Sequence, residues 1–262
     1  MSIRKPAVAG LFYPGDRDEL QNWLATTQSQ ANQALPPDLG TVRAVQVPHA
    51  GYVYSGQLAV TGLMALRRHE WKALAVLGPC HQVAIDGLAL PGDDELATPL
   101  GNLPVPADLA AGVSRLGAVT TSRYVHQYEH SIEVQLPIIR WLFGEIPVLP
   151  LAVGHADPLV VAQVLEALDD ETGVVISSDL SHYLPEPEAH AIDAETLEMV
   201  LRSEQIPTRR ACGGYPLSGM TAWARQRSLT PRILSYATSA DTIGDPARVV
   251  GYSAIAWEVN DD

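Results

Sequence analysis

Residue types that bind metals or transfer protons follow three apolar runs of this sequence. His49 comes after "AVQVP" and His81 after "LAVLGPC". Asp179 and His182 come after "VVISS". Imidazole nitrogen and carboxylate oxygen bind divalent metals, and histidine also transfers protons near neutral pH. Each run is typical of a buried strand, and ligands of open α/β sheets bind outside the carboxyl ends of the strands. We therefore expect these separate segments to meet at one site.

The stretch "YVHQYEHSIEVQLP" (124–137) holds more such side chains. His126 and His130 are four residues apart, a spacing that places two histidines on one face of a helix. The residues between them do not follow the H-E-x-x-H order of zinc proteases, so the match to that motif is weak. Either Ser131 and Glu133 form a polar helix cap, or this segment lines a pocket.

A cysteine in "RRACGGYPLSG" (209–219) is a further candidate. Cys212 precedes two glycines and Pro216, which predicts a tight, exposed turn. An exposed thiol is open to oxidation and, as thiolate, binds soft or borderline metals. Two interpretations stay open, a metal or redox role and burial at the start of a helix. Cys80, in "GPCH", also reads as a small buried apolar residue.

Alternation of β-branched runs with longer amphipathic ones predicts an α/β fold, with a mixed central sheet flanked by helices on both faces. The predicted strands are 41–47, 72–78, 147–154, 232–239 and 248–259, and the segment 173–183 is expected to open as a buried strand. The predicted helices are 56–69, 107–116, 131–144, 157–170, 187–202 and 219–227. Between 81 and 106, Gly and Pro punctuate short strands that we expect to form a hairpin. We find no linker and predict a single domain over 1–262.

Composition narrows the class of protein. The 262 residues are 47% hydrophobic and 18% charged, with a net charge of −13. These values exclude a disordered chain, and the negative charge disfavours nucleic acid and anionic membranes as partners. No apolar run reaches the ~18 residues of a membrane span. Two cysteines are too few for a disulfide framework, so we expect a cytoplasmic protein.

Seven ordered motifs resemble those of the Memo family, named AmmeMemoRadiSam system protein B in prokaryotes. The motifs are "KPAVAGLFYPGD" (5–16), "VPHAGYVYSG" (47–56), "LGPCH" (77–81), "HQYEHSIEVQLP" (126–137), "SSDLSHY" (177–183), "CGGYP" (212–216) and "GYSAIAWE" (251–258). They span nearly the whole chain. The resemblance implies a fold similar to class III extradiol dioxygenases, non-heme iron enzymes that cleave catechol-type rings.

The resemblance also implies a metal centre. By this likeness His49, His81 and Cys212 hold iron(II) or copper, with zinc as a further possibility. His182 is similar to the acid-base histidine of the dioxygenases, with Asp179 either orienting it or serving as another ligand. His130 and Tyr54 are expected to line the pocket. The dioxygenases carry glutamate where this sequence has Cys212, and a thiolate changes the metal, so ring cleavage does not follow.

Two function classes follow from the resemblance. The first is a non-heme iron or copper oxidoreductase acting on a small molecule or peptide, with His182, Asp179 and His130 as its catalytic residues. The second is a scaffold that binds a peptide or partner in the same crevice and works with radical-SAM and AmmeMemoRadiSam protein A proteins. Phosphotyrosine peptides, which Memo relatives bind in animals, are disfavoured by the acidic composition. Metal sequestration is a third possibility.

Overall fold

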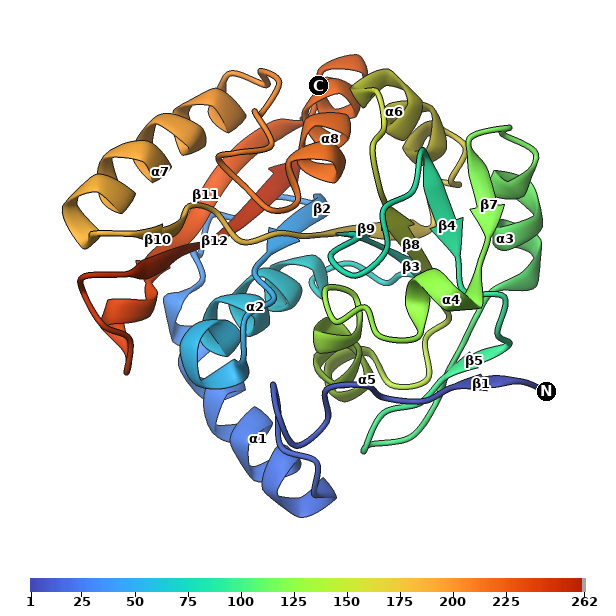
Figure 1. The fold of residues 1–262 in the computed structure, drawn as a ribbon, viewed down its shortest axis with the longest axis horizontal. Coiled ribbons are helices and arrows are strands. Elements are labelled where there is room, and N and C mark those ends of the chain that lie inside the picture. Colours follow the sequence, from blue (N-terminus) through green and yellow to red (C-terminus); the bar gives the residue numbers. More distant parts are fainter. Residues whose placement is uncertain (261–262) are drawn as a thin grey trace.

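Nine strands form one mixed sheet within residues 1–260, the part of the chain that the computed structural model describes (Figure 1). In sheet order they are β10 (His182–Leu184), β12 (Val249–Glu258), β2 (Val42–Val47), β9 (Thr172–Ser177), β3 (Ala73–Pro79), β8 (Val148–Val153), β4 (Leu88–Leu90) and β7 (Val119–Thr121), with β11 (Thr230–Thr238) paired to β12. The neighbours β2, β9, β3 and β8 are parallel and fully buried. The predicted mixed α/β sheet is confirmed.

Helices cover both faces of this sheet (Figure 1). One face carries α1 (Arg17–Ala34), α2 (Tyr52–Leu66) and α5 (Leu136–Phe143), and the other carries α6 (Pro158–Glu166), α7 (Glu186–Leu201) and α8 (Gly214–Gln226). Alternate residues of a strand point to opposite faces. Accordingly Val45 and Val47 of β2 join the first core and Ala44 joins the second. The predicted helices on both faces are therefore present.

The remaining described elements lie at the edges. They are α3 (Ala107–Ser114), α4 (Arg123–His126), two 3₁₀ turns at Glu133–Gln135 and Ser239–Asp241, and a small three-stranded sheet of β1 (Ile3–Arg4), β5 (Glu95–Leu96) and β6 (Leu103–Pro104). Strands β5 and β6 are antiparallel, as expected for the hairpin within 81–106. Strand β4 instead joins the large sheet.

Several element boundaries differ from the prediction. Helix α2 begins at Tyr52 and not at 56, and α8 begins at Gly214 and not at 219. The segment 173–183 opens as the predicted buried strand, β9, and a second short strand, β10, begins at His182. Pro137 lies in the first turn of α5, where its missing N–H costs nothing, so the helix starts there and not at 131. Helix α1, capped by Asp16, has no counterpart in the prediction.

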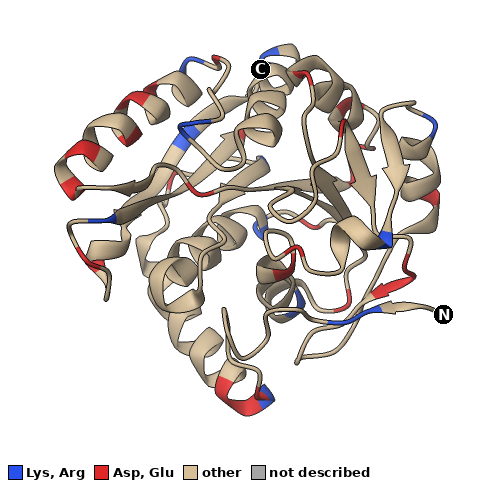
Figure 2. Ribbon diagram, in the orientation of Figure 1, with Lys and Arg blue, Asp and Glu red and all other residues tan. Residues whose placement is uncertain are grey.

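The outer surface carries much of the acidic charge. Figure 2 shows Asp and Glu repeated along α7. Among residues 1–260, no helix has both the length and the apolar character that crossing a bilayer requires.

The carboxyl ends of the central parallel strands lie side by side. Val47 at the end of β2 pairs with Ser177 at the end of β9, and Leu77 of β3 pairs with Ile176. The next residues of each chain segment are the predicted candidates, so the sheet itself brings these distant segments together.

Candidate metal centre and pocket

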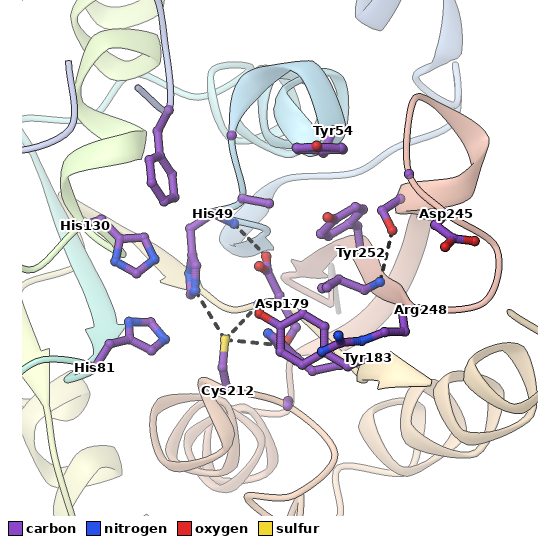
Figure 3. A pocket seen from close by; sticks show the side chains of 18 of the residues that line it. His49, Tyr54, His81, His130, Asp179, Tyr183, Cys212, Asp245, Arg248 and Tyr252 are labelled. Carbon is purple, nitrogen blue, oxygen red and sulfur yellow. Dashed lines mark hydrogen bonds between the residues drawn. The ribbon is translucent and has the colours of Figure 1, made fainter. Parts of the chain in front are cut away.

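A pocket of about 760 Å³ lies at this edge of the sheet (Figure 3). Every predicted site residue lines it: His49, Tyr54, His81, His130, Asp179, His182 and Cys212. The convergence expected from the strand ends is therefore present in the structure. The pocket draws its walls from segments spread over most of the chain, from Phe12 to Tyr252.

A chain of hydrogen bonds fixes the tautomer of His49, which is buried. Its Nδ1 lies 2.9 Å from Ser177 Oγ. The Ser177 hydroxyl donates its one proton to the Ser131 carbonyl over 2.6 Å, because a carbonyl only accepts. The Gln135 amide donates to the Pro48 carbonyl and to Ser177 Oγ. Ser177 therefore accepts the Nδ1 proton of His49, and Nε2 carries no proton.

The unprotonated Nε2 of His49 accepts a hydrogen bond from the thiol of Cys212, with 3.2 Å between the nitrogen and Sγ. Burial lowers the pKa of His49 well below its ordinary value, and the nearby His81 and His130 lower it further. His49 is thus neutral. A neutral imidazole with a lone pair on its unprotonated nitrogen is the form that binds a metal.

Cys212 lies directly before α8, where the chain folds closely against the end of β9. The backbone N–H of Asp179 donates to Sγ over 3.3 Å. A Cβ on Gly213 would come within 2.6 Å of the Ser178 side chain, so the glycine permits this approach. Burial and the Asp179 charge raise the pKa of the thiol. The predicted turn is present at Cys212 and Gly213, but Cys212 is only partly exposed, because the turn packs closely against the end of β9 before the helix starts.

Asp179 follows β9 and is buried beside these two residues. Its Oδ1 accepts the backbone N–H of His49 over 2.7 Å. Burial raises the pKa of its carboxyl, while this hydrogen bond and the surrounding histidines act in the opposite direction. A buried carboxyl beside neutral donors would be stabilised in its charged form by a cation.

Glu129 connects the other two histidines. Its carboxylate accepts the backbone N–H of His81 over 2.6 Å and lies 2.9 Å from His81 Nδ1. The same group lies 3.5 Å from His130 Nδ1 and accepts the Ser131 N–H over 2.9 Å. Burial raises the pKa of Glu129, but the His81 contacts and the backbone N–H groups outweigh it, so its pKa falls to about 2. Glu129 thus holds the His81 ring by Nδ1 and lies beside Nδ1 of His130.

These side chains form two groups of possible metal ligands that share His49. In each group the donor atoms lie within 4.8 Å of one another. The first group is His49, His81 and His130, and the second is His49, Asp179 and Cys212. The predicted set of His49, His81 and Cys212 is therefore divided between two groups. His130, predicted as a pocket residue, is itself a possible ligand. Imidazole, thiol and carboxyl donors together suit a borderline transition metal.

His182 lies apart from both groups, at the start of β10, and its side chain is exposed. Its Nδ1 lies 2.8 Å from the Leu180 carbonyl. Since a carbonyl only accepts, Nδ1 carries the proton and Nε2 is the free nitrogen. Two roles are predicted for Asp179, orienting His182 or serving as a further ligand. The partner of His182 Nδ1 is the Leu180 carbonyl, and Asp179 lies in a group of possible ligands.

Two other candidates from the sequence do not join the ligand groups of residues 1–260. Cys80 packs against the core, where burial and the Glu129 charge raise its pKa to about 12. His126 is buried and bonds through Nε2 to the Ala89 carbonyl over 2.7 Å. The four-residue spacing of His126 and His130 therefore does not mark a helical ligand pair.

Three residues of the site lie outside the sequence-based set of ligands. They are Glu129, Ser177 and Gln135, and each acts through a histidine. All three fall within the motifs "HQYEHSIEVQLP" and "SSDLSHY". The signal for Glu129 was its place next to a candidate histidine, whereas only the fold reveals that it also reaches His81.

Comparison with known proteins agrees with this architecture. The family model for Memo-like proteins matches residues 4–256. The chain belongs to the Memo-like family. Among its relatives are MEMO1 family proteins from Aeropyrum pernix and Methanosarcina mazei, each 34% identical. The first alignment covers 97% of this Memo-like chain and 99% of the relative, and the second covers 98% and 100%.

A solved structure supports the fold of this Memo-like chain. It is an uncharacterized protein from Escherichia coli K12, aligned over 81% of this chain and 99% of its own, with a TM-score of 0.55. Sequence identity is 16%, so the likeness concerns the fold alone.

Proposed function

We propose that the pocket binds one iron or copper ion and carries out a redox reaction on a small organic molecule or peptide. The observation that carries the proposal is His49. It belongs to both groups of possible ligands, it is neutral, and its bond to Ser177 leaves Nε2 without a proton and directed at Cys212 Sγ, another possible ligand. An imidazole held in this tautomer and orientation is suited to bind a metal ion, which a histidine that only packs in the core would not need.

Three side chains are assigned as the main ligands, namely His49, His81 and Cys212. His130 and Asp179 are the nearest additional donors, one in each group. Nitrogen and sulfur donors suit iron(II), copper and zinc, in contrast to magnesium or calcium. An iron or copper ion there supplies a redox centre and a Lewis acid. Glu129 holds the imidazole of His81 in place, which strengthens a ligand of this kind.

Proton transfer in the pocket is assigned to His182. Its Nδ1 is used by the Leu180 carbonyl, so Nε2 is free to accept or release a proton. The ring is exposed and lines the pocket, so it exchanges protons with water and with a bound substrate. Tyr54 lines the wall of the same pocket.

Metal loading of the anaerobically purified full chain tests the proposal. We expect wild-type protein to bind close to one equivalent of iron(II) or copper, measured by elemental analysis, and then to consume O₂. His49→Ala should lose this binding. His69→Ala, which removes an exposed histidine outside the pocket, should behave as wild type. A chain that stays metal-free and inert after loading would contradict the proposal.

Two further outcomes divide the alternatives. Tight binding without O₂ consumption would favour metal sequestration. Equal metal binding by wild type and His49→Ala would place the ion elsewhere.

We also propose a cytoplasmic location, supported by two cysteines that are both free thiols, as is usual in a reducing compartment.

A further inference from the structure

The pocket has a second end, away from the ligand groups, built on β12. Arg248, Val250 and Tyr252 all line it. Residues two apart on a strand point to the same face. Arg248 directly precedes the first residue of β12, so it lies on the same face as Val250 and Tyr252. Figure 3 shows Arg248 and Tyr252 in this part of the pocket. These residues take no part in either group of possible metal ligands.

Tyr252 is buried in the wall of the pocket, but its hydroxyl oxygen is not among the fully buried polar atoms of residues 1–260. The residue is only 2% exposed, and the hydrogen bonds of residues 1–260 include none to its hydroxyl. A hydroxyl that borders a pocket without a partner in the protein is open to water or to a ligand. Burial, together with the nearby Asp179, raises the pKa of Tyr252. The hydroxyl therefore remains a hydrogen-bond donor.

Arg248 is held over the ring of Tyr183, with 4.9 Å between the guanidinium carbon and the ring centroid. Tyr183 is 62% exposed and has a φ of 59°, a left-handed conformation that is unusual for a bulky residue. Pairing of its strand with β12 fixes it there, since His182 is opposite Val250. Strained residues of this kind cluster where ligands bind.

The guanidinium of Arg248 has no carboxylate partner within 4.0 Å among residues 1–260. Ion pairs do form at seven other arginines: Arg4, Arg123, Arg140, Arg202, Arg210, Arg227 and Arg232. Arg209 lines the same pocket and, within residues 1–260, also has no carboxylate partner. Asp245 lines the same pocket, but its carboxylate accepts the Ala247 N–H over 2.9 Å. The chain has a net charge of −13, yet Arg248 lines a pocket without a carboxylate partner. Its guanidinium is therefore available to bind an anionic ligand.

We propose that Arg248 and Tyr252 bind the carboxylate of a small organic acid whose other end reaches His49. The assignment rests on the proposed function, because it names the substrate class of that pocket. Guanidinium and hydroxyl donors together match the two oxygens of a carboxylate. The nearby Asp245 favours a singly charged carboxylate over a doubly charged phosphate.

Binding of benzoate to the metal-free full chain, followed by NMR titration, tests this proposal. Because no metal is present, the result does not depend on the metal centre. Benzamide serves as the neutral probe and phenyl phosphate as the dianionic one. The variants are Arg248→Gln, Arg248→Lys and Tyr252→Phe. Arg232→Gln is the control, because this arginine pairs with Asp38 outside the pocket.

We expect Arg248→Gln to weaken benzoate binding about tenfold or more, and Tyr252→Phe to weaken it by less. Lysine should restore only part of the affinity, because it lacks the planar fork. Benzamide binding should not change, and Arg232→Gln should match wild type. Metal affinity of Arg248→Gln should also equal wild type. The proposal is overturned if wild type shows no saturable benzoate binding, if Arg248→Gln binds benzoate normally, or if phenyl phosphate binds more tightly.

Discussion

Two buried glutamates, Glu129 and Glu133, lie four residues apart in one segment and serve different ends. Glu133 is 1% exposed and forms an ion pair with Arg4. It also accepts the N–H groups of Ala7 and Val8 and the Tyr13 hydroxyl. Its charge is therefore satisfied by the N-terminal segment. Glu129 is 2% exposed, and its charge is directed at His81 and His130.

The comparison shows that the partner of a buried carboxylate decides its role. Glu133 has an arginine whose charge is permanent, so the pair fastens two parts of the fold. Glu129 has imidazoles, whose free nitrogens face the pocket. The histidines of the segment divide in the same way, since His126 bonds to a backbone carbonyl and His130 lines the pocket. The segment thus contains both kinds of residue: His126 and Glu133 stabilise the fold, and Glu129 and His130 belong to the site.

The largest expected effect comes from breaking the structural pair. Glu133→Gln leaves the Arg4 guanidinium buried without its counter-charge. Loss of one partner from a buried ion pair costs about 3–5 kcal/mol. We expect this drop in the free energy of unfolding by urea denaturation, while the folded fraction keeps wild-type metal affinity. A decrease of less than about 1 kcal/mol in the free energy of unfolding would contradict the structural role assigned to Glu133.

The structural histidine should make stability depend on pH. Burial lowers the pKa of His126 from 6.5 to about 4, although its bond to Ala89 opposes this. As pH falls from about 6.5 to about 4, the unfolded chain takes up a proton that the folded chain does not, so stability decreases, by on the order of 3 kcal/mol.

Urea unfolding at a series of pH values measures this loss. His126→Gln should make the slope shallower in that pH range, while His49 and His130, whose pKa values burial also lowers, maintain the rest. His155→Gln, which removes an exposed histidine, should leave it as in wild type. An unchanged slope in His126→Gln would contradict the assignment.

The site carboxylate should affect metal binding more than stability. Glu129→Gln keeps the shape of the side chain but removes the charge that holds His81 and lies beside His130. Removing a group that orients metal ligands typically costs 10–100-fold in metal affinity. Competition with a chelator measures the affinity. Glu145→Gln, at an exposed ion pair, is the control. Wild-type metal affinity in Glu129→Gln would contradict the role in the metal site that distinguishes Glu129 from Glu133.

The smallest effect should come from Tyr13→Phe. The Tyr13 hydroxyl donates to Glu133 over 2.8 Å. Because Arg4 and two backbone N–H groups still satisfy this carboxylate, we expect a loss of only about 1 kcal/mol in stability. Thermal unfolding measures it, and metal affinity should be unchanged. An altered metal affinity would show that the two glutamates are coupled.

Much of the fold and of the site could be predicted because parallel strands impose simple geometry. The runs that end before His49, His81 and Asp179 are strongly apolar, and their carboxyl ends must share one edge. The exposure of Cys212 was predicted less well, because glycines that permit close packing look the same as glycines of an exposed turn. The role of Glu129 could not be predicted, since it depends on contact with His81, 48 residues away in sequence.

The assignment of the ion to His49 is tested most directly by anomalous diffraction from crystals of the metal-loaded protein. Data collected on both sides of the iron or copper edge locate the ion and identify the element. We predict one peak within bonding distance of His49 Nε2, close to the His81 and Cys212 donor atoms. A peak distant from His49, or no peak in protein that has taken up one equivalent of metal, would contradict this account.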